Sequence, residues 1–245
     1  MKIATLNTWG TRGPGERQAV VLEALRALGA DLLLLQEVTD PKRFGSLPYP
    51  TRLHAPLSGL SLLSRLPLAA EIPSRVVTYE TRSALEPYAR EAFLAPLKVG
   101  SKLLWVVTTH LAWQQADEPT RLAQVEELLR LTSGLGENLL FSGDFNAEPL
   151  SPPIRRILQA GFLDLFPVAH PNNPGITWDN QNPFIQGHSV KFPDRRIDYL
   201  FLHRKAIQWM KLESCQVICR APTPEGLYPS DHYGVLADFK IEGLR

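Results

Sequence analysis

A chain of 245 residues can form one large domain or two small ones, and it can bury a substantial core. Its net charge of +1 argues against a protein that binds duplex DNA mainly through a basic surface, although a local basic patch is compatible with it. Cys215 and Cys219 have no histidine or cysteine partners at zinc spacing, which favours free thiols over a disulfide framework. No signal peptide follows Met1, and no apolar run approaches the roughly 20 residues that span a bilayer. We therefore expect a cytoplasmic protein that does not insert into membranes.

The first quarter of the chain alternates short apolar runs with one helical pattern. Leu22, Leu25 and Leu28 recur at helical spacing, and Gly29 suits the position just after a helix. Strand, helix and strand in this order favour a βαβ-like layer. The predicted elements are strands over 2–6 and 32–35, a helix over 16–28 and a proline-rich surface loop over 41–57.

The middle of the chain predicts several strands and two helices. Gly100 and Ser101 are predicted to form a hairpin turn between two of the strands. Pro119 suits the first turn of an amphipathic helix, and Ser151 and Gly161 suit the start and the end of a shorter one. The predicted strands are 59–64, 68–78, 89–99, 102–109 and 138–142, and the longer helix covers 117–131.

The last third contains a long polar segment, residues 167–194, that is rich in proline and asparagine and lacks periodicity. Loops of this length in a compact domain are usually functional or disordered. Further strands are predicted over 197–202, 206–218 and 235–241. Because no internal repeat or linker is visible, we expect a single domain over residues 1–245.

Polar residues stand at the ends of the apolar runs. Asp144 and Asn146 follow one run two residues apart, so they would face the same way from the end of a strand. Taken alone, this stretch could equally be an ordinary polar turn. The ends of neighbouring strands meet at one edge of a sheet, so all of these side chains can converge there. The set is Asn7, Glu37, His110, Asp144, Asn146, Asp198, Asp231 and His232.

This set of side chains indicates phosphoryl chemistry. Oxygen-rich ligation suits Mg²⁺ or Mn²⁺ better than zinc, and magnesium usually takes only one or two protein carboxylates. The remaining carboxylates can activate water or orient a histidine. Asp198 paired with His232 would favour a protonated imidazole, which can hydrogen-bond a phosphoryl oxygen. A metal, a positioned water and cationic donors are what phosphoryl hydrolysis needs.

Five short motifs in this order resemble the metal-dependent endonuclease/exonuclease/phosphatase superfamily. The resemblance runs from Asn7 to Asp238, and it implies a four-layer α/β sandwich in which two mixed β-sheets lie face to face with helices outside. Each motif alone is weak, whereas five in the right order are strong. The motifs are Leu35-Gln36-Glu37-Val38, Thr109-His110-Leu111, Gly143-Asp144-Phe145-Asn146, Arg196-Ile197-Asp198-Tyr199 and Ser230-Asp231-His232.

The resemblance also implies roles for individual residues. Glu37 would be the main metal ligand, with Asn7 and Asp231 nearby. Asp144 would activate the attacking water, although either an Asp or a His can be the base in this family. Some members carry an acid where this chain has Trp9, so a second metal ligand is missing there. The remaining implied contacts to phosphate or water come from Asn146, His110 and His232, with Arg90 as a candidate basic contact.

The substrate class stays open at this level. The motifs around Trp178, Asp198 and His232 are similar to those of 5′-tyrosyl-DNA phosphodiesterases, whereas Asn7-Thr8-Trp9-Gly10 is closer to neutral sphingomyelinases. We expect Trp178 to be an exposed ring that stacks on a base or a phenol. A phosphodiester or phosphomonoester in a small, single-stranded or end-exposed substrate fits best, bound by a monomer. The alternatives are a small-molecule or lipid-headgroup phosphatase or phosphodiesterase, a nuclease that repairs duplex ends, and a non-catalytic binding module.

Overall fold

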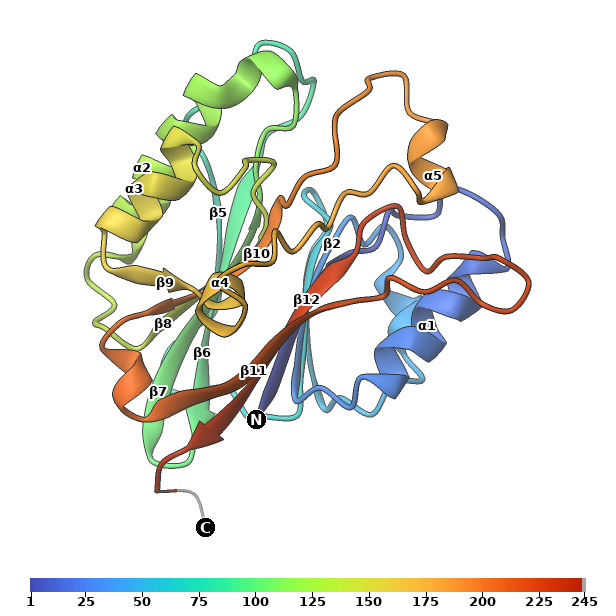
Figure 1. Ribbon diagram of the computed structural model, residues 1–245. Helices are drawn as coiled ribbons and strands as arrows, with labels where there is room; N and C mark the ends of the chain where they lie inside the picture. The colour runs from blue at the N-terminus through green and yellow to red at the C-terminus, as the bar shows by residue number, and fades with distance from the viewer. Residues whose placement is uncertain (244–245) are drawn as a thin grey trace.

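The computed structural model, which describes residues 1–243, contains two six-stranded mixed sheets that pack face to face (Figure 1). The first sheet has the order β11 (Met210–Ile218), β12 (Gly234–Ile241), β1 (Lys2–Asn7), β2 (Leu32–Gln36), β4 (Leu60–Ser64) and β3 (Thr51–Ala55). The second has the order β5 (Arg75–Thr78), β6 (Glu91–Val99), β7 (Lys102–His110), β8 (Leu139–Asp144), β10 (Asp198–His203) and β9 (Phe162–Asp164).

Helices cover the two outer faces, which completes the predicted four-layer sandwich (Figure 1). Helix α1 (Arg17–Ala27) packs on the first sheet, and α2 (Glu118–Thr132) and α3 (Pro152–Gln159) pack on the second. No helix in the described part of the chain is both long and apolar enough to cross a bilayer. The short helical segments are α4 (Leu165–Ala169), α5 (Pro183–Gln186) and the 3₁₀ turns η1 (Pro41–Phe44), η2 (Gln115–Asp117) and η3 (Ala206–Gln208).

Side-chain alternation places apolar residues between the sheets and polar residues at one edge. Ile3 of β1 and Leu140 of β8 are fully buried between the sheets, and Asn7 and Asp144 lie four residues further along the same strand faces. Strands β1 and β2 are parallel, as are β7 and β8, so the carboxyl ends of each pair share an edge. Strand β10 runs antiparallel to β8, and its first residue, Asp198, lies directly opposite Asp144. The predicted convergence of strand ends at one edge is therefore present.

A buried hydrogen-bonded layer separates the apolar core from this edge. Gln36 of β2 donates through Nε2 to Oγ1 of Thr5 on β1 and to Oγ1 of Thr108 on β7, both at 3.1 Å. Thr5 and Gln36 belong to one sheet and Thr108 to the other, so the amide joins the sheets. Because buried polar groups cost free energy unless paired, this layer fixes the spacing of the sheets beneath the edge.

Several predicted boundaries are wrong. The segment 41–57 is not simply a loop, because it contains β3 between Pro50 and Pro56. Strand β3 is an edge strand that pairs only with β4, and prolines are tolerated beside such strands. Of the predicted strand 68–78 only β5 forms, with one isolated bridge before it, and the predicted strand 206–218 begins with the turn η3. The sequence patterns also missed β9, α4 and α5.

Candidate active site

The carboxylate of Asp144 is the point on which the predicted site residues converge. Its Oδ2 accepts a hydrogen bond from Nδ2 of Asn7 at 3.1 Å. The same oxygen lies 3.3 Å from Nε2 of His110 and 3.7 Å from Nε2 of His232. Its Oδ1 accepts the backbone N–H of Asn146 at 2.9 Å. Four residues, three of them distant from Asp144 in the sequence, thus surround one buried acid.

Gly143 sets the position of this acid. Its φ of +130° is one that side-chain-bearing residues rarely adopt, and a Cβ there would lie 1.9 Å from the carbonyl oxygen of Thr109. The close approach is made between β7 and β8, one residue before His110 and Asp144. The absence of a side chain at Gly143 therefore lets these two functional groups come within contact distance.

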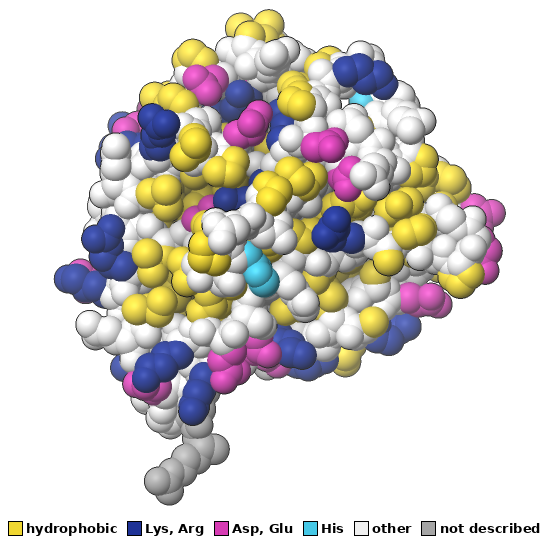
Figure 2. Space-filling view, viewed as in Figure 1, with side chains coloured by type: hydrophobic (Ala, Val, Ile, Leu, Met, Phe, Trp, Pro, Cys, Tyr) yellow, Lys and Arg dark blue, Asp and Glu magenta, His cyan; other side chains and the backbone are white. Residues whose placement is uncertain are grey.

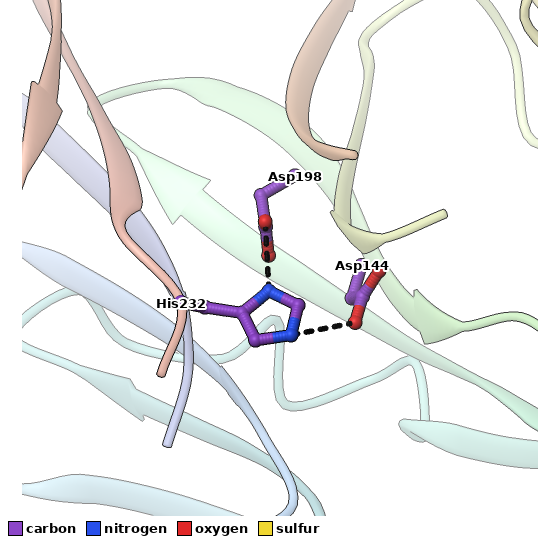
Figure 3. A group of neighbouring side chains, drawn as sticks. All are labelled: Asp144, Asp198 and His232. Carbon is purple, nitrogen blue, oxygen red and sulfur yellow. Dashed lines mark hydrogen bonds and ion pairs between the residues drawn. The ribbon is translucent and has the colours of Figure 1, made fainter. Parts of the chain in front are cut away.

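His232 is held between two carboxylates (Figure 3). Its Nδ1 lies 3.0 Å from Oδ2 of Asp198, and its other nitrogen faces Asp144. The ring of Trp178 packs edge-on against the imidazole at 5.0 Å between centroids. Burial by itself would lower the pKa of His232, but the surrounding carboxylates, Asp198 first, outweigh it and raise the pKa. The imidazole is therefore protonated at neutral pH and donates to Asp198.

Burial affects the other two titratable groups of the cluster in opposite senses. It raises the pKa of Asp144, with a further rise from Asp198, while the positive charge of His232 acts against this rise. It lowers the pKa of His110 well below its usual value, and the positive charges of Arg90 and His232 lower it further. The site thus holds one cationic and one neutral histidine on the same carboxylate.

Glu37 is a second acid of the site, and it lines the same cavity as Asp144. Its backbone has a φ of +54°, and its Oε1 accepts a hydrogen bond from Nδ2 of Asn7 at 3.1 Å. Its Oε2 is paired with Nη1 of Arg12 at 2.6 Å, and the side chain of Arg12 is 65% exposed. Within residues 1–243 this exposed guanidinium is the one charged partner of Glu37, so the carboxylate can exchange it for another cation.

Asp231 and His188 form a separate pair that lines the same cavity. Oδ2 of Asp231 lies 3.0 Å from Nε2 of His188. Asp231, a predicted metal ligand, therefore already has a hydrogen-bond partner. His188 also packs against the rings of Trp9 and Trp178. Sequence reasoning missed His188 and Arg12, although His188 lies inside the long polar segment that is predicted to be functional or disordered.

Arg17 joins the two loops that carry these residues. It is fully buried, and its guanidinium donates to backbone carbonyls of Thr8 at 2.9 Å, Gly10 at 2.8 Å, Arg12 at 2.9 Å and Pro229 at 2.7 Å. Burial lowers the pKa of Arg17 to about 10. One side chain thereby ties the loop after β1 to the loop before β12.

A cavity of about 590 Å³ opens onto Asp144, Glu37 and His232. The expectation that Trp178 is an exposed ring is wrong, since it is only 6% exposed, but it does line this cavity. The reason is that the long polar segment folds back over it, with Trp178 bridged to Arg195. The aromatic residues of the wall are Trp9, Tyr88, Trp113, Trp178, Phe184 and Phe192.

Arg90 does not line this cavity but an adjoining one. It lines a second cavity of about 420 Å³ that shares Arg12, Glu37, Tyr88 and His110 with the first. Its side chain is 8% exposed, and its Nε donates to Oε2 of Glu86 at 2.8 Å. The predicted substrate-binding residues Trp178 and Arg90 thus belong to different cavities.

Asp144, Asp198 and His232 place potential ligand atoms within 4.8 Å of one another and could hold a metal ion. However, a histidine must be neutral to act as a ligand, and the raised pKa of His232 disfavours the neutral form. Protonated His232 instead donates to Asp198 and lies at ion-pair distance, 3.7 Å, from Asp144.

This fold with this cluster defines a phosphoric ester hydrolase. The model of the Endonuclease/Exonuclease/phosphatase family matches residues 4–232. The chain belongs to this family.

Relatives by sequence are distant. The inositol phosphosphingolipids phospholipase C of Schizosaccharomyces pombe is 26% identical over 289 aligned positions, which cover 96% of this chain and 67% of that protein. Nocturnin of Drosophila melanogaster is 27% identical over 171 positions, which cover 56% of this chain and only 25% of that protein.

Solved structures show the same fold across almost the whole chain. Danio rerio TDP2 in complex with a single-strand DNA product has a TM-score of 0.80 at 19% identity, covering 98% of each chain. The human nocturnin catalytic domain with bound sulfate has a TM-score of 0.74 at 20% identity, covering 98% of this chain and 94% of that one.

Proposed function

We propose that the protein hydrolyses a phosphodiester with the help of Mg²⁺ or Mn²⁺, using a water molecule activated by Asp144. The observation that carries this proposal is the convergence of Asn7, His110 and His232 on one oxygen of Asp144. A buried carboxylate with a raised pKa is suited to accept a proton from water.

The residues around Glu37 fit a hard divalent cation. Glu37 offers carboxylate oxygens to the cavity, and exposed Arg12 could give way to another cation. Asn7 could add its Oδ1, which accepts the backbone N–H of Trp9 in this structure. Asp231 could join only if it released His188. When bound, the metal would offset the charge of the phosphate and polarise it.

The remaining residues would act on the proton and the phosphate. Protonated His232, held in place by Asp198, would donate a hydrogen bond to a phosphoryl oxygen, and neutral His110 would donate another. Asn146 would orient the phosphate or the water from its position after β8; its Nδ2 is bound to the carbonyl of Leu111. Trp178 would position the imidazole and the substrate.

An aromatic cavity beside the phosphate site supports a substrate with an aromatic arm, such as a base or a tyrosyl group in single-stranded or end-exposed nucleic acid. The fold of a TDP2 bound to single-strand DNA product is in keeping with this choice. A lipid-headgroup phosphodiesterase is the second candidate, supported by the phospholipase C relative that matches 96% of the chain. We also predict a cytoplasmic monomer with one domain over residues 1–245.

Initial rates with bis(p-nitrophenyl) phosphate and p-nitrophenyl phosphate, in Mg²⁺, in Mn²⁺ and in excess EDTA, test the proposal directly. We expect metal-dependent turnover that is faster for the diester. A tyrosyl-linked oligonucleotide and a phosphoinositol sphingolipid then separate the two substrate classes. Full activity in EDTA would refute the mechanism, and no hydrolysis of any of these esters would leave a binding module as the better description.

A further inference from the structure

The second cavity is a pocket with unused hydrogen-bond donors. Among the described residues, Nη2 of Arg90 and Oγ of Ser58 are buried and have no hydrogen-bond partner, and both residues line this cavity. In the described part of the chain, the Arg90 guanidinium makes one hydrogen bond, from Nε to Glu86. Unpaired buried donors cost free energy, so a pair of them in one cavity indicates that something else satisfies them.

The unpaired donors of the cavity suit an anion, and its charges are balanced in pairs. Arg12 and Arg90 supply two guanidinium groups to its wall, and His110 is neutral. Glu37 is the one acid in the wall, and it is already paired with Arg12. Under the proposed function Glu37 would also face a divalent cation. Arg90 is paired in turn with buried Glu86, so what the wall can offer an anion is the unpaired N–H of Arg90 and the hydroxyl of Ser58.

The position of the cavity determines which part of a substrate it can reach. It shares Glu37 and His110 with the aromatic cavity, so the two cavities flank the same reaction centre. A phosphodiester has two arms, and an aromatic arm matches the first cavity better, because of its six Trp, Tyr and Phe residues only Tyr88 also lines the second. The other arm would enter the cavity lined by Ser58 and Arg90.

We propose that the Ser58–Arg90 cavity is a second anion subsite, which binds a phosphate carried on the arm opposite the aromatic one. This inference rests on the proposed function and narrows it to diesters that carry an additional phosphate. Arg90 would bind that phosphate through its Nη atoms, and Ser58 would donate its hydroxyl.

Two chromogenic esters test this subsite. Thymidine 5′-(p-nitrophenyl phosphate) and the same ester with a 3′-phosphate differ only in the proposed anchor group. We expect kcat/KM to be about tenfold higher for the 3′-phosphorylated ester, mainly through a lower KM. Equal kcat/KM values would overturn the subsite while leaving the proposed function intact. If neither ester is hydrolysed, the proposed function fails, and the subsite is then judged by binding alone.

Variants and binding measurements locate the effect. Ser58→Ala and Arg90→Lys should each shrink the ratio of the two kcat/KM values, whereas Ser133→Ala and Arg130→Lys, at exposed positions on or just after α2, should leave it unchanged. Calorimetry in EDTA should show that thymidine 3′,5′-bisphosphate binds more tightly than thymidine 5′-phosphate. The same comparison of binding affinity between myo-inositol 1,4-bisphosphate and myo-inositol 1-phosphate tests whether the additional phosphate can be carried on a lipid headgroup. The subsite is supported if the bisphosphate binds more tightly in either pair and Ser58→Ala abolishes this difference. It is contradicted if the bisphosphate binds no more tightly in either pair.

Discussion

The imidazole of His232 donates from Nδ1 to Oδ2 of Asp198 across 3.0 Å, and this contact determines which way the second nitrogen points. With Asp198 in place, Nε2 faces Asp144 and the reaction centre. Both carboxylates stabilise the imidazolium, so they raise the pKa of His232 above its usual value. The orientation and the charge of this histidine therefore depend on the same partner.

Asp198→Asn should lower kcat by about 10²-fold, because the amide no longer holds His232 in its charged, oriented form. Removing a carboxylate that raises the pKa means that His232 loses its proton at a lower pH. The alkaline limb of the pH–rate profile should therefore move to lower pH, which initial rates across a pH series would measure. An unchanged limb would contradict the pairing as a source of the charge.

Asp144→Asn and Asp144→Ala should each lower kcat by about 10³-fold, since both remove the proton acceptor. Burial already disfavours the charged form of Asp144, so the isosteric Asn variant should keep the Tm or raise it at neutral pH. His232→Ala should also lose most of kcat. Circular dichroism melts provide the stability measurement, and Glu225→Ala, at an exposed acid, is the control. Rates like those of the unchanged protein in any of these variants would remove that residue from the site.

Arg12 should compete with the divalent cation for Glu37. Arg12→Ala should tighten Mn²⁺ binding by up to about fivefold, a modest gain because the ion pair is largely exposed. Glu37→Gln should weaken it strongly, since a neutral amide is a poorer ligand. Calorimetric titration with Mn²⁺ measures both effects without turnover, and Arg130→Ala serves as the control. Unchanged Mn²⁺ affinity in Glu37→Gln would place the metal elsewhere.

Gly143→Ala should destabilise the fold by at least about 3 kcal/mol and also reduce activity. The added Cβ would meet the carbonyl of Thr109 at 1.9 Å, so β7 and β8 must separate and move His110 away from Asp144. Gly134→Ala is the matched control, because a Cβ there meets nothing within 4 Å. Urea denaturation of both variants gives the comparison, and equal midpoints would show that the strands relax at no cost.

Strand periodicity accounts for most of what the sequence predicted. Asn7, His110 and Asp144 each end a strand on its inner face, and Asp198 begins one, so alternation alone brings these four to one edge. The strand β3 escaped prediction because it is short, flanked by prolines and paired on one side only. Its five residues, Thr51–Ala55, also contain no continuous apolar run.

Residues contributed by loops could not be predicted in the same way. Arg12, Ser58 and His188 reach the site from segments without periodicity, where position depends on contacts between distant parts of the chain. Arg17 shows this most clearly, since its helical position gives no sign that it binds the carbonyl of Pro229. The composition of the long polar segment set it apart from the rest of the chain, but its fold over Trp178 depends on tertiary packing.

The two cavities that meet at Glu37 are built from separate stretches of chain, one around Ser58 and Arg90 and the other around Phe184 and His188. In the face of the molecule shown in Figure 2, basic and acidic side chains are interspersed, so recognition need not rely on a broad charged surface. Mutations in one stretch can therefore change which substituent of the ester one cavity binds. The hydrolytic centre and the other cavity then remain unchanged. Such an arrangement allows the specificity for each of the two ester substituents to evolve separately, by recombination or loop exchange.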